Sequence, residues 1–398
     1  MINNNQIFPD NYGCNFDLEI NRAVSSSLKY DGRQGMFGNT EVIPLWVADM
    51  DFAAPLAVTR ALSERAMHPV YGYTLYPDSL YESLIEWLAK HHGWHNVHRD
   101  WIIMCPGVVP SLHAAAMAFS EPGESIIVQP PVYFPFFSAV TNTGRNLTLN
   151  PLVIENNRYS IDFDRLEKCA EKAKILFLCS PHNPVGRVWD KEELENILRI
   201  SREHNLVIFS DEIHADLVFS ENKHQMLAAL AEDSENIVTA VAPSKTFNIP
   251  GLNLSALIVP NKKRRNLIMK AFETLHISAS NPFSIVAFEA AYREGGPWLT
   301  KLLAYLQGTR DFIEQYLMEY LPKIKLIKPE GTYLLWLDCR KLGMSDTQLH
   351  HFFIDEAGVG MSPGTLFGEG GQGFMRMNIG APHHIIATAL ENIRKAIK

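Results

Sequence analysis

Six short apolar runs, separated by helical patterns, dominate the sequence between about residues 100 and 260. They are 101–105 (WIIMC), 125–129 (SIIVQ), 175–179 (ILFLC), 206–210 (LVIFS), 237–241 (IVTAV) and 254–259 (LSALIV). Runs of this length without polar alternation are typical of strands covered on both faces. The clearest intervening helix follows Asp190, with Glu193 three residues on as in a capping box. This alternation predicts an α/β domain with a mostly parallel central sheet.

The two chain ends have a different pattern. A helical stretch runs from about 283 to 320, and it is followed by a strand-like run at 332–337, a helix near 346–357, a strand near 374–379 and a helix at 383–397. The first 60 residues contain no complete strand–helix–strand unit. We therefore predict a large central domain (61–285) and a smaller α+β domain built from both chain ends (1–60 and 286–398). A cleft between two domains is a common place for a ligand site.

Composition excludes several classes of protein. With 36 basic and 44 acidic residues, the net charge of −8 argues against a nucleic-acid-binding surface. The one basic run, 262–265, is interpreted as a solvated helix face. No stretch approaches the ~18 apolar residues of a membrane helix. The N-terminus lacks a signal-peptide pattern, and the five cysteines are scattered without a C-x-x-C pair, so we expect a cytoplasmic protein.

Polar side chains follow three of the predicted strands. Asn183 lies in SPHNPVGR after the third run, Asp211 begins DEIH after the fourth, and Lys245 lies in SKTFN after the fifth. The carboxyl ends of parallel strands meet at one edge of a sheet and line its ligand crevice. We therefore expect these three side chains to lie close together.

These three groups together match one cofactor. A partly desolvated lysine forms a Schiff base with an aldehyde, a buried aspartate holds a heteroaromatic nitrogen protonated, and an amide donates to a phenolate oxygen. That set fits pyridoxal phosphate. Taken alone, a lysine is usually a surface residue and an aspartate after a strand is usually a helix cap. A phosphate site is expected at 106–111 (PGVVPS), where a glycine turn opens an apolar helix.

Seven segments carry a family resemblance. They are 47–52 (VADMDF), 72–74 (GYT), 131–133 (PVY), 180–189 (SPHNPVGRVW), 211–214 (DEIH), 242–248 (APSKTFN) and 376–378 (RMN). With them, nearly the whole chain resembles the fold-type I pyridoxal-phosphate enzymes of the aspartate aminotransferase superfamily. Within that superfamily it is most similar to the MalY/PatB cystathionine β-lyases and the cystalysin-type C–S lyases.

The resemblance implies a role for each matching residue at the cofactor ring. Lys245 would carry the cofactor as a Schiff base and, once displaced by substrate, act as general base on the Cα proton. Asp211 would pair with the pyridine nitrogen, and Asn183 would bind the 3′-oxygen. Tyr133 would stack on the ring. His214 stands where many aminotransferases have tyrosine, and it is a further candidate contact to the cofactor.

The resemblance also implies contacts to phosphate and substrate. Val108, Val109 and Ser244 would bind the phosphate. Tyr73 would reach the phosphate of the neighbouring subunit's cofactor, which implies a homodimer with shared active sites. Arg376 would clamp the substrate α-carboxylate, because its planar fork matches that group. The implied substrate contacts are Arg376, Asn183 and Tyr133.

Two departures bear on the activity. Superfamily aminotransferases typically have a phosphate-binding arginine where Asn253 stands here, and the lyase branch commonly lacks it too. A second tyrosine of cystalysin-type lyases is Phe134 here. The resemblance thus implies a C–S β-lyase that converts cystathionine or a related cysteine derivative to thiol, pyruvate and ammonia. An aminotransferase on the same scaffold is the alternative. A third hypothesis is a regulatory protein that keeps the cofactor but acts by binding another protein.

Three other patterns receive simpler interpretations. The segment 368–373 (GEGGQG) fits G-x-G-x-x-G, but it precedes a strand-like run, so we expect a loop leading to Arg376. The histidines of 91–98 (HHGWHNVH) are interpreted as surface residues at a helix end, and no metal site is predicted. Asp49 and Asp51 would share one face of an extended segment, and the sequence assigns them no function.

Overall fold

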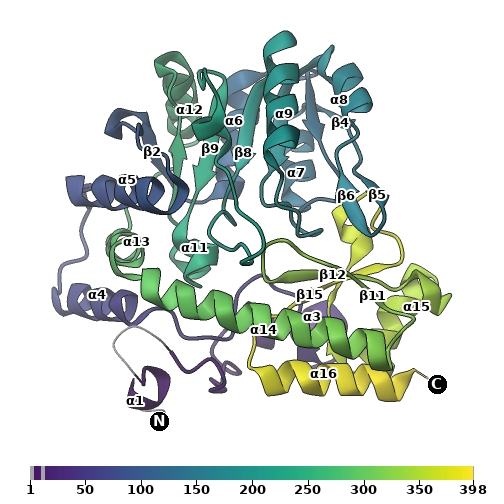
Figure 1. Ribbon diagram of the computed structural model, residues 1–398. Coiled ribbons are helices and arrows are strands. Elements are labelled where there is room, and N and C mark those ends of the chain that lie inside the picture. Colours follow the sequence, from purple (N-terminus) through teal and green to yellow (C-terminus); the bar gives the residue numbers. More distant parts are fainter. Residues whose placement is uncertain (1–3, 10–13, 398) are drawn as a thin grey trace.

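The computed structural model describes residues 4–9 and 14–397 and contains two main sheets. Figure 1 shows the larger sheet in the upper half of the molecule and the smaller one at the lower right, with the long helix α14 (Gly296–Tyr320) running beneath. None of the helices in the described part of the chain is long and apolar enough to cross a membrane.

The larger sheet has seven strands, and all but β10 run in the same direction. In spatial order they are β2 (Ile102–Cys105), β10 (Ser255–Ile258), β9 (Ile237–Val241), β8 (Val207–Asp211), β7 (Ala173–Cys179), β3 (Ser125–Val128) and β4 (Asn146–Leu149). Each of the six apolar runs forms one of these strands, so the predicted α/β domain with a mostly parallel sheet is confirmed.

Helices cover both faces of this sheet. Helices α6 (Val108–Phe119), α7 (Pro135–Thr141) and α12 (Lys262–Thr274) pack on one face, and α8 (Phe163–Ala170) and α9 (Lys191–Glu203) pack on the other. Successive side chains of β7 alternate between the two layers, as the period of a strand requires. The predicted capping box is present, because Asp190 and Glu193 each accept a backbone N–H of the other.

The smaller sheet is antiparallel and is built from the C-terminal part of the chain. Its strands, in spatial order, are β11 (Lys325–Ile327), β12 (Leu334–Asp338), β15 (Phe374–Asn378) and β14 (Ser362–Pro363). Strand β12 begins later than predicted because Thr332 adopts a left-handed conformation with φ of 69°. The N-terminal strand β1 (Ile43–Pro44) pairs in parallel with β13 (Val359–Gly360), so both chain ends contribute to this region. The domain boundaries at 60 and 285 stay a prediction.

The remaining elements surround these sheets. The other helices are α1 (Asn4–Ile7), α2 (Leu28–Asp31), α3 (Arg33–Phe37), α4 (Leu56–Met67), α5 (Asp78–His92), α10 (Leu227–Leu230), α11 (Pro243–Thr246), α13 (Pro282–Glu294), α15 (Asp346–His351) and α16 (His383–Ala396). A hairpin joins β5 (Val153–Glu155) to β6 (Arg158–Ser160), and a π-helical turn, Phe352–Glu356, extends α15.

The basic run 262–265 is only partly a solvated helix face. Lys262 and Lys263 are exposed at the start of α12, as expected. Arg264 and Arg265 are half-buried instead. Arg265 donates to the carbonyl oxygens of Val259 and Pro260, so it caps the chain that leaves β10.

Candidate active site

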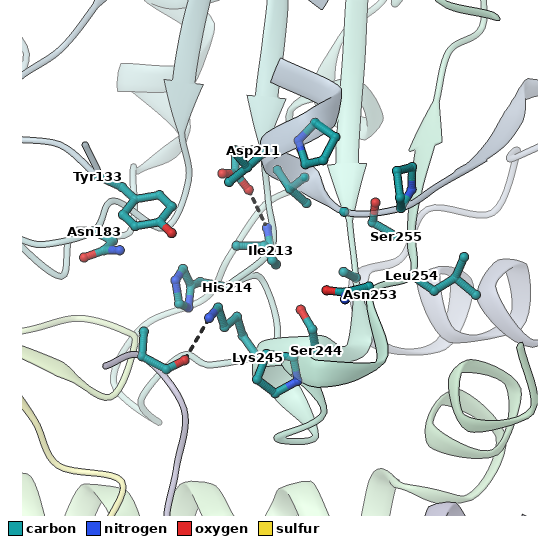
Figure 2. Close-up of a pocket in the computed structure, with 18 of the residues that line it drawn as sticks. Tyr133, Asn183, Asp211, Ile213, His214, Ser244, Lys245, Asn253, Leu254 and Ser255 are labelled. Carbon is teal, nitrogen blue, oxygen red and sulfur yellow. Dashed lines mark hydrogen bonds between the residues drawn. The ribbon is translucent and has the colours of Figure 1, made fainter. Parts of the chain in front are cut away.

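Three neighbouring parallel strands end at one cavity. Strands β7, β8 and β9 lie side by side, and the cavity beyond their carboxyl ends has a volume of about 440 Å³. Asn183, Asp211 and Lys245 all line it, each from the segment at the end of one of these strands (Figure 2). The convergence that the strand-end argument predicts is therefore present, although 62 residues separate Asn183 from Lys245 along the chain.

The N-terminus of α6 opens into the same cavity. Gly107 precedes this helix with φ of 152°, a backbone conformation that side chains rarely adopt. Val108 and Val109 in its first turn line the cavity, together with Ser244 and Asn253. The first N–H groups of a helix lack intrahelical partners and carry a partial positive charge. This end of the cavity is therefore suited to an anion.

Lys245 is half-buried and is held by a backbone oxygen. Its Nζ donates to the carbonyl oxygen of Ala48 at 2.8 Å, and the hydroxyl of Tyr333 donates to the same oxygen at 2.9 Å. Burial, helped by the positive charge of Arg376, lowers the pKa of Lys245 to about 8. The amine is therefore partly neutral near physiological pH, which suits it to attack an aldehyde and to accept a proton.

Asp211 lies deep in the cavity with little to stabilise its charge. Burial raises its pKa to about 7, although the Ile213 N–H donates to its Oδ1 at 3.2 Å. His214, three residues on, is buried too, and burial lowers its pKa to about 3. Among the described residues, the Nδ1 atom of His214 has no hydrogen-bond partner. Within the described part of the chain, the cavity thus holds a carboxyl group without a cationic partner at hydrogen-bonding distance and a neutral imidazole with an unbonded nitrogen.

Arg376 on β15 of the smaller sheet does not line the cavity itself, but it bonds Asn183, which does. Its Nη1 donates to Asn183 Oδ1 at 3.2 Å, its Nη2 donates to the Trp46 carbonyl oxygen at 2.8 Å, and its guanidinium lies 4.9 Å from the ring centre of Phe367. Burial lowers its pKa to about 10, so it remains charged. Its Nε has no partner among the described residues, which leaves a buried donor for a ligand.

Tyr133 is positioned by Asn183. Its backbone N–H donates to the Asn183 carbonyl oxygen at 3.1 Å, and its ring lines the cavity. Burial raises the pKa of its phenol. Figure 2 shows the ring on the same side of the cavity as Asn183, across from Ser244.

The segment 46–52 forms the wall on the other side of Lys245. Asn378 Nδ2 donates to the carbonyl oxygens of Val47 (2.5 Å) and Asp49 (2.6 Å), and Asn248 Nδ2 donates to those of Met50 (2.9 Å) and Phe52 (2.7 Å). With the bonds to Trp46 and Ala48 already described, the backbone of this wall is held by β15 of the smaller sheet and by α11 with the turn that follows it. The aspartates of this segment have a structural partner, because Arg22 donates to Asp49 at 2.7 Å and to Asp51 at 2.7 Å, and the buried Lys29 also pairs with Asp51.

One predicted site residue lies away from the cavity. Tyr73 is fully exposed, within the extended stretch between α4 and α5. Its proposed contact with a neighbouring subunit stays a prediction. The segment 368–373 is a loop before β15, as expected.

One of the histidines of the stretch 91–98 was wrongly predicted to be a surface residue. His91, His95 and His98 are exposed near the end of α5, as expected. His92 is not a surface residue, because its side chain is 7% exposed and its Nε2 lies 2.7 Å from Asp216 Oδ1. Its partner lies 124 residues away in the chain, which is why the local pattern did not reveal it.

Two groups beside Lys245, the Ala48 carbonyl and the Tyr333 side chain, could not be predicted from the sequence. Ala48 acts through its backbone carbonyl, which carries no residue-specific signature. Tyr333 follows a turn in a strand-like run, where an aromatic residue predicts only a buried strand.

A half-buried lysine, a buried carboxyl group and a helix N-terminus line one cavity, and an arginine bonds the amide on its wall. Together these groups define an enzyme site for an anionic aromatic aldehyde and an amino acid. The family model of aminotransferase class I and II matches residues 40–393, and the chain belongs to this family.

Individual relatives show which members of this family the chain resembles. The chain is 42% identical to cystathionine β-lyase PatB of Bacillus subtilis, over 96% of this chain and 100% of PatB. It is 30% identical to protein MalY of Escherichia coli, over 96% of this chain and 98% of MalY. The crystal structure of cystalysin from Treponema denticola, which contains pyridoxal 5′-phosphate, superposes with a TM-score of 0.93 at 35% identity, over 96% of this chain and 98% of cystalysin.

Proposed function

We propose that this protein is a pyridoxal-phosphate-dependent C–S β-lyase. It cleaves the Cβ–S bond of cystathionine or a related cysteine derivative and releases a thiol, and the remaining aminoacrylate is hydrolysed by one water to pyruvate and ammonia. The observation that carries the proposal is the placement of Lys245 in one cavity with Asp211 and beside the Asn183–Arg376 pair. The similarity to PatB and cystalysin supports the C–S lyase activity over other activities of the family.

The residues of the cavity fit pyridoxal phosphate. The N-terminus of α6 and Ser244 suit the phosphate, and Lys245 suits the aldehyde. Asp211 suits the ring nitrogen, because a positive charge there would lower the raised pKa of this carboxyl group. A cavity of about 440 Å³ is within the usual range for a cofactor site. When bound, the cofactor supplies a ring that accepts electrons from the substrate Cα.

Different residues of the chain then bind the substrate, move the Cα proton and stabilise the ring. Arg376 binds the α-carboxylate with its fork and orients the Cα–H bond toward Lys245, with Asn183 and Tyr133 beside it. Lys245 takes the proton from Cα, which its lowered pKa of about 8 permits near neutral pH. Loss of the β-thiolate follows, and Asp211 stabilises positive charge at the ring nitrogen throughout.

We also propose a homodimer with shared sites. The last residue of α4 and the stretch after it expose several large apolar side chains, namely Met67, Val70, Tyr71, Tyr73 and Leu75. Exposed apolar side chains grouped in this way are typical of a protein interface. In the proposed dimer, Tyr73 reaches the phosphate in the partner's cavity. A cytoplasmic location is part of the proposal, because all five cysteines are free thiols.

An aminotransferase remains the second candidate, because the matched family model bears that name. In that reaction Lys245 would return the proton to the C4′ atom of the cofactor instead of allowing the thiolate to leave. One incubation separates the two. With L-cystathionine and no keto acid, the lyase releases pyruvate and free thiol in equal, catalytic amounts. If neither appears, and an added keto acid is converted to its amino acid, the aminotransferase replaces the proposal.

A further inference from the structure

A buried polar network lies directly behind the catalytic lysine. Thr246, the residue after Lys245, is fully buried and does not line the cavity. Its hydroxyl donates to Asp216 Oδ2 at 2.8 Å. The other carboxylate oxygen, Oδ1, accepts from Trp87 Nε1 at 2.9 Å and pairs with His92 Nε2 at 2.7 Å. Asp216 therefore ties α11, which carries Ser244 and Lys245, to helix α5.

The charges within this network are balanced. Burial opposes ionisation of Asp216, but the hydrogen bonds from His92, Trp87 and Thr246 outweigh it and hold the pKa of Asp216 below its usual value. Burial also opposes protonation of His92, but its bond to Asp216 outweighs that effect and raises the pKa of His92. Both directions favour an ion pair, and a paired, fully bonded carboxylate is a rigid anchor.

A second carboxylate–histidine pair lies beside the first. Glu212, next to Asp211, is buried, and its Oε2 pairs with His224 Nε2 at 2.7 Å. Its Oε1 accepts from Ser210 Oγ at 2.8 Å. The rings of His224 and His92 are 5.9 Å apart. The strand that carries Asp211 and the helix that carries Lys245 are thus both backed by such a pair.

Helix α11 needs such an anchor. It has four residues, and a helix this short has no stability of its own. Its position is set by contacts of the residues within and just after it. Thr246 holds it to Asp216, and Asn248 holds the following turn to the segment 46–52.

We propose that Asp216 is a positioning residue that fixes Lys245 through the hydroxyl of Thr246, with His92 as its counter-ion. The proposal rests on the proposed function, in which Lys245 carries the cofactor and moves the Cα proton. Removing the Thr246 hydroxyl leaves Asp216 underbonded and α11 free to shift, and a misplaced catalytic group slows the chemical step more than binding.

The test compares Thr246→Val with Thr246→Ser in the cofactor-saturated full-length enzyme. Valine keeps the shape of threonine without its hydroxyl, and serine keeps the hydroxyl. Thr239→Val on β9 is the matched control, because the buried hydroxyl of Thr239 has no partner among the described residues. Two quantities are measured: the pH midpoint of the visible absorbance of the cofactor attached to Lys245, and the separate kcat and KM values for elimination.

Thr246→Val is expected to shift the absorbance midpoint and to lower kcat roughly tenfold at nearly constant KM. Thr246→Ser and Thr239→Val should behave as wild type. Asp216→Asn, which keeps the side-chain shape, should reproduce the shift of the midpoint and provides the test if the valine variant does not fold. Wild-type midpoint and kcat in Thr246→Val and Asp216→Asn overturn the proposal, and so does a serine variant as impaired as the valine variant. The midpoint requires only bound cofactor, so a wild-type enzyme that binds cofactor without eliminating thiol would refute the proposed function separately.

Discussion

The ε-amino nitrogen of Lys245 lies 2.8 Å from the carbonyl oxygen of Ala48 and donates a hydrogen bond to it. Ala48 belongs to the segment 46–52, whose neighbouring carbonyl oxygens are bound by Asn378 and Asn248. The lysine therefore rests against a stretch of backbone that is itself held by β15 and by the turn after α11. This contact gives the free amine a defined resting place on the wall of the cavity.

Tyr333 contacts the same carbonyl oxygen and is expected to affect the pKa of Lys245. Its hydroxyl donates to the same oxygen, which weakens the acceptor for the charged form of Lys245. In Tyr333→Phe the ammonium should be held more strongly, so the pKa of Lys245 should rise above about 8, by roughly 0.5–1 unit. The pH dependence of the rate of cofactor association reports this pKa, because the neutral amine attacks the aldehyde. Tyr159→Phe, a buried tyrosine bonded to Trp336, is the control, and equal midpoints in both variants would contradict the assignment.

Ionisation of the buried Asp211 should lower the free energy of unfolding of the cofactor-free protein. Its carboxyl group ionises near pH 3.8 in an unfolded chain, whereas burial raises its pKa to about 7 in the folded one. Between these values the folded protein binds the additional proton, so the free energy of unfolding falls as the pH rises through this window. Asp211→Asn should therefore be more stable than wild type by up to about 4 kcal/mol at pH 8, and the gain should disappear at pH 4.

Chemical denaturation of the cofactor-free proteins at the two pH values measures this difference. A gain that is the same at both values would show that ionisation of Asp211 is not its cause. With cofactor bound, the variant should lose its advantage, because the ring nitrogen no longer meets a carboxylate.

Arg376→Lys should separate charge from geometry at the carboxylate clamp. Lysine keeps the positive charge but lacks the planar fork and the contacts of Arg376 to Asn183 and Trp46. We expect kcat/KM to fall by about 100-fold, with KM raised and kcat lowered together. The matched control is a substrate analogue without the α-carboxylate. Wild type should discriminate strongly against it and the variant much less, and undiminished discrimination would place the carboxylate elsewhere.

Subunit complementation tests the role of Tyr73. If this exposed side chain serves the partner's cavity, Lys245→Ala and Tyr73→Ala homodimers should each be impaired, whereas a mixed dimer contains one site with both residues intact. After the subunits are exchanged, activity should rise to about a quarter of the wild-type value. Mixing without any recovery would assign Tyr73 to its own subunit or to no site.

The strand ends were predictable from the sequence, whereas the contacts between distant segments were not. Asn183, Asp211 and Lys245 each follow a buried apolar run, and parallel pairing brings such ends together whatever the loops between them do. A histidine at a helix end usually lies on the surface, so the sequence predicts an exposed His92. Only the fold brings it to Asp216, which removes both groups from water.

Segment 46–52 illustrates a second limit of sequence reasoning. Asp49 and Asp51 suggest paired carboxylates. In the structure they form ion pairs with Arg22 and Lys29 instead. The chemically important atom of this segment is the carbonyl oxygen of Ala48, which every residue type possesses. A backbone acceptor can be located only once the fold has placed it 2.8 Å from the lysine.

Attachment of the cofactor to Lys245 is the most direct test of the account. The cofactor-saturated enzyme is reduced with borohydride, digested, and the peptides are examined by mass spectrometry. We expect a single phosphopyridoxyl group, on the peptide that contains Lys245. A modified lysine elsewhere, or no modification in a protein that has bound the cofactor, would contradict it.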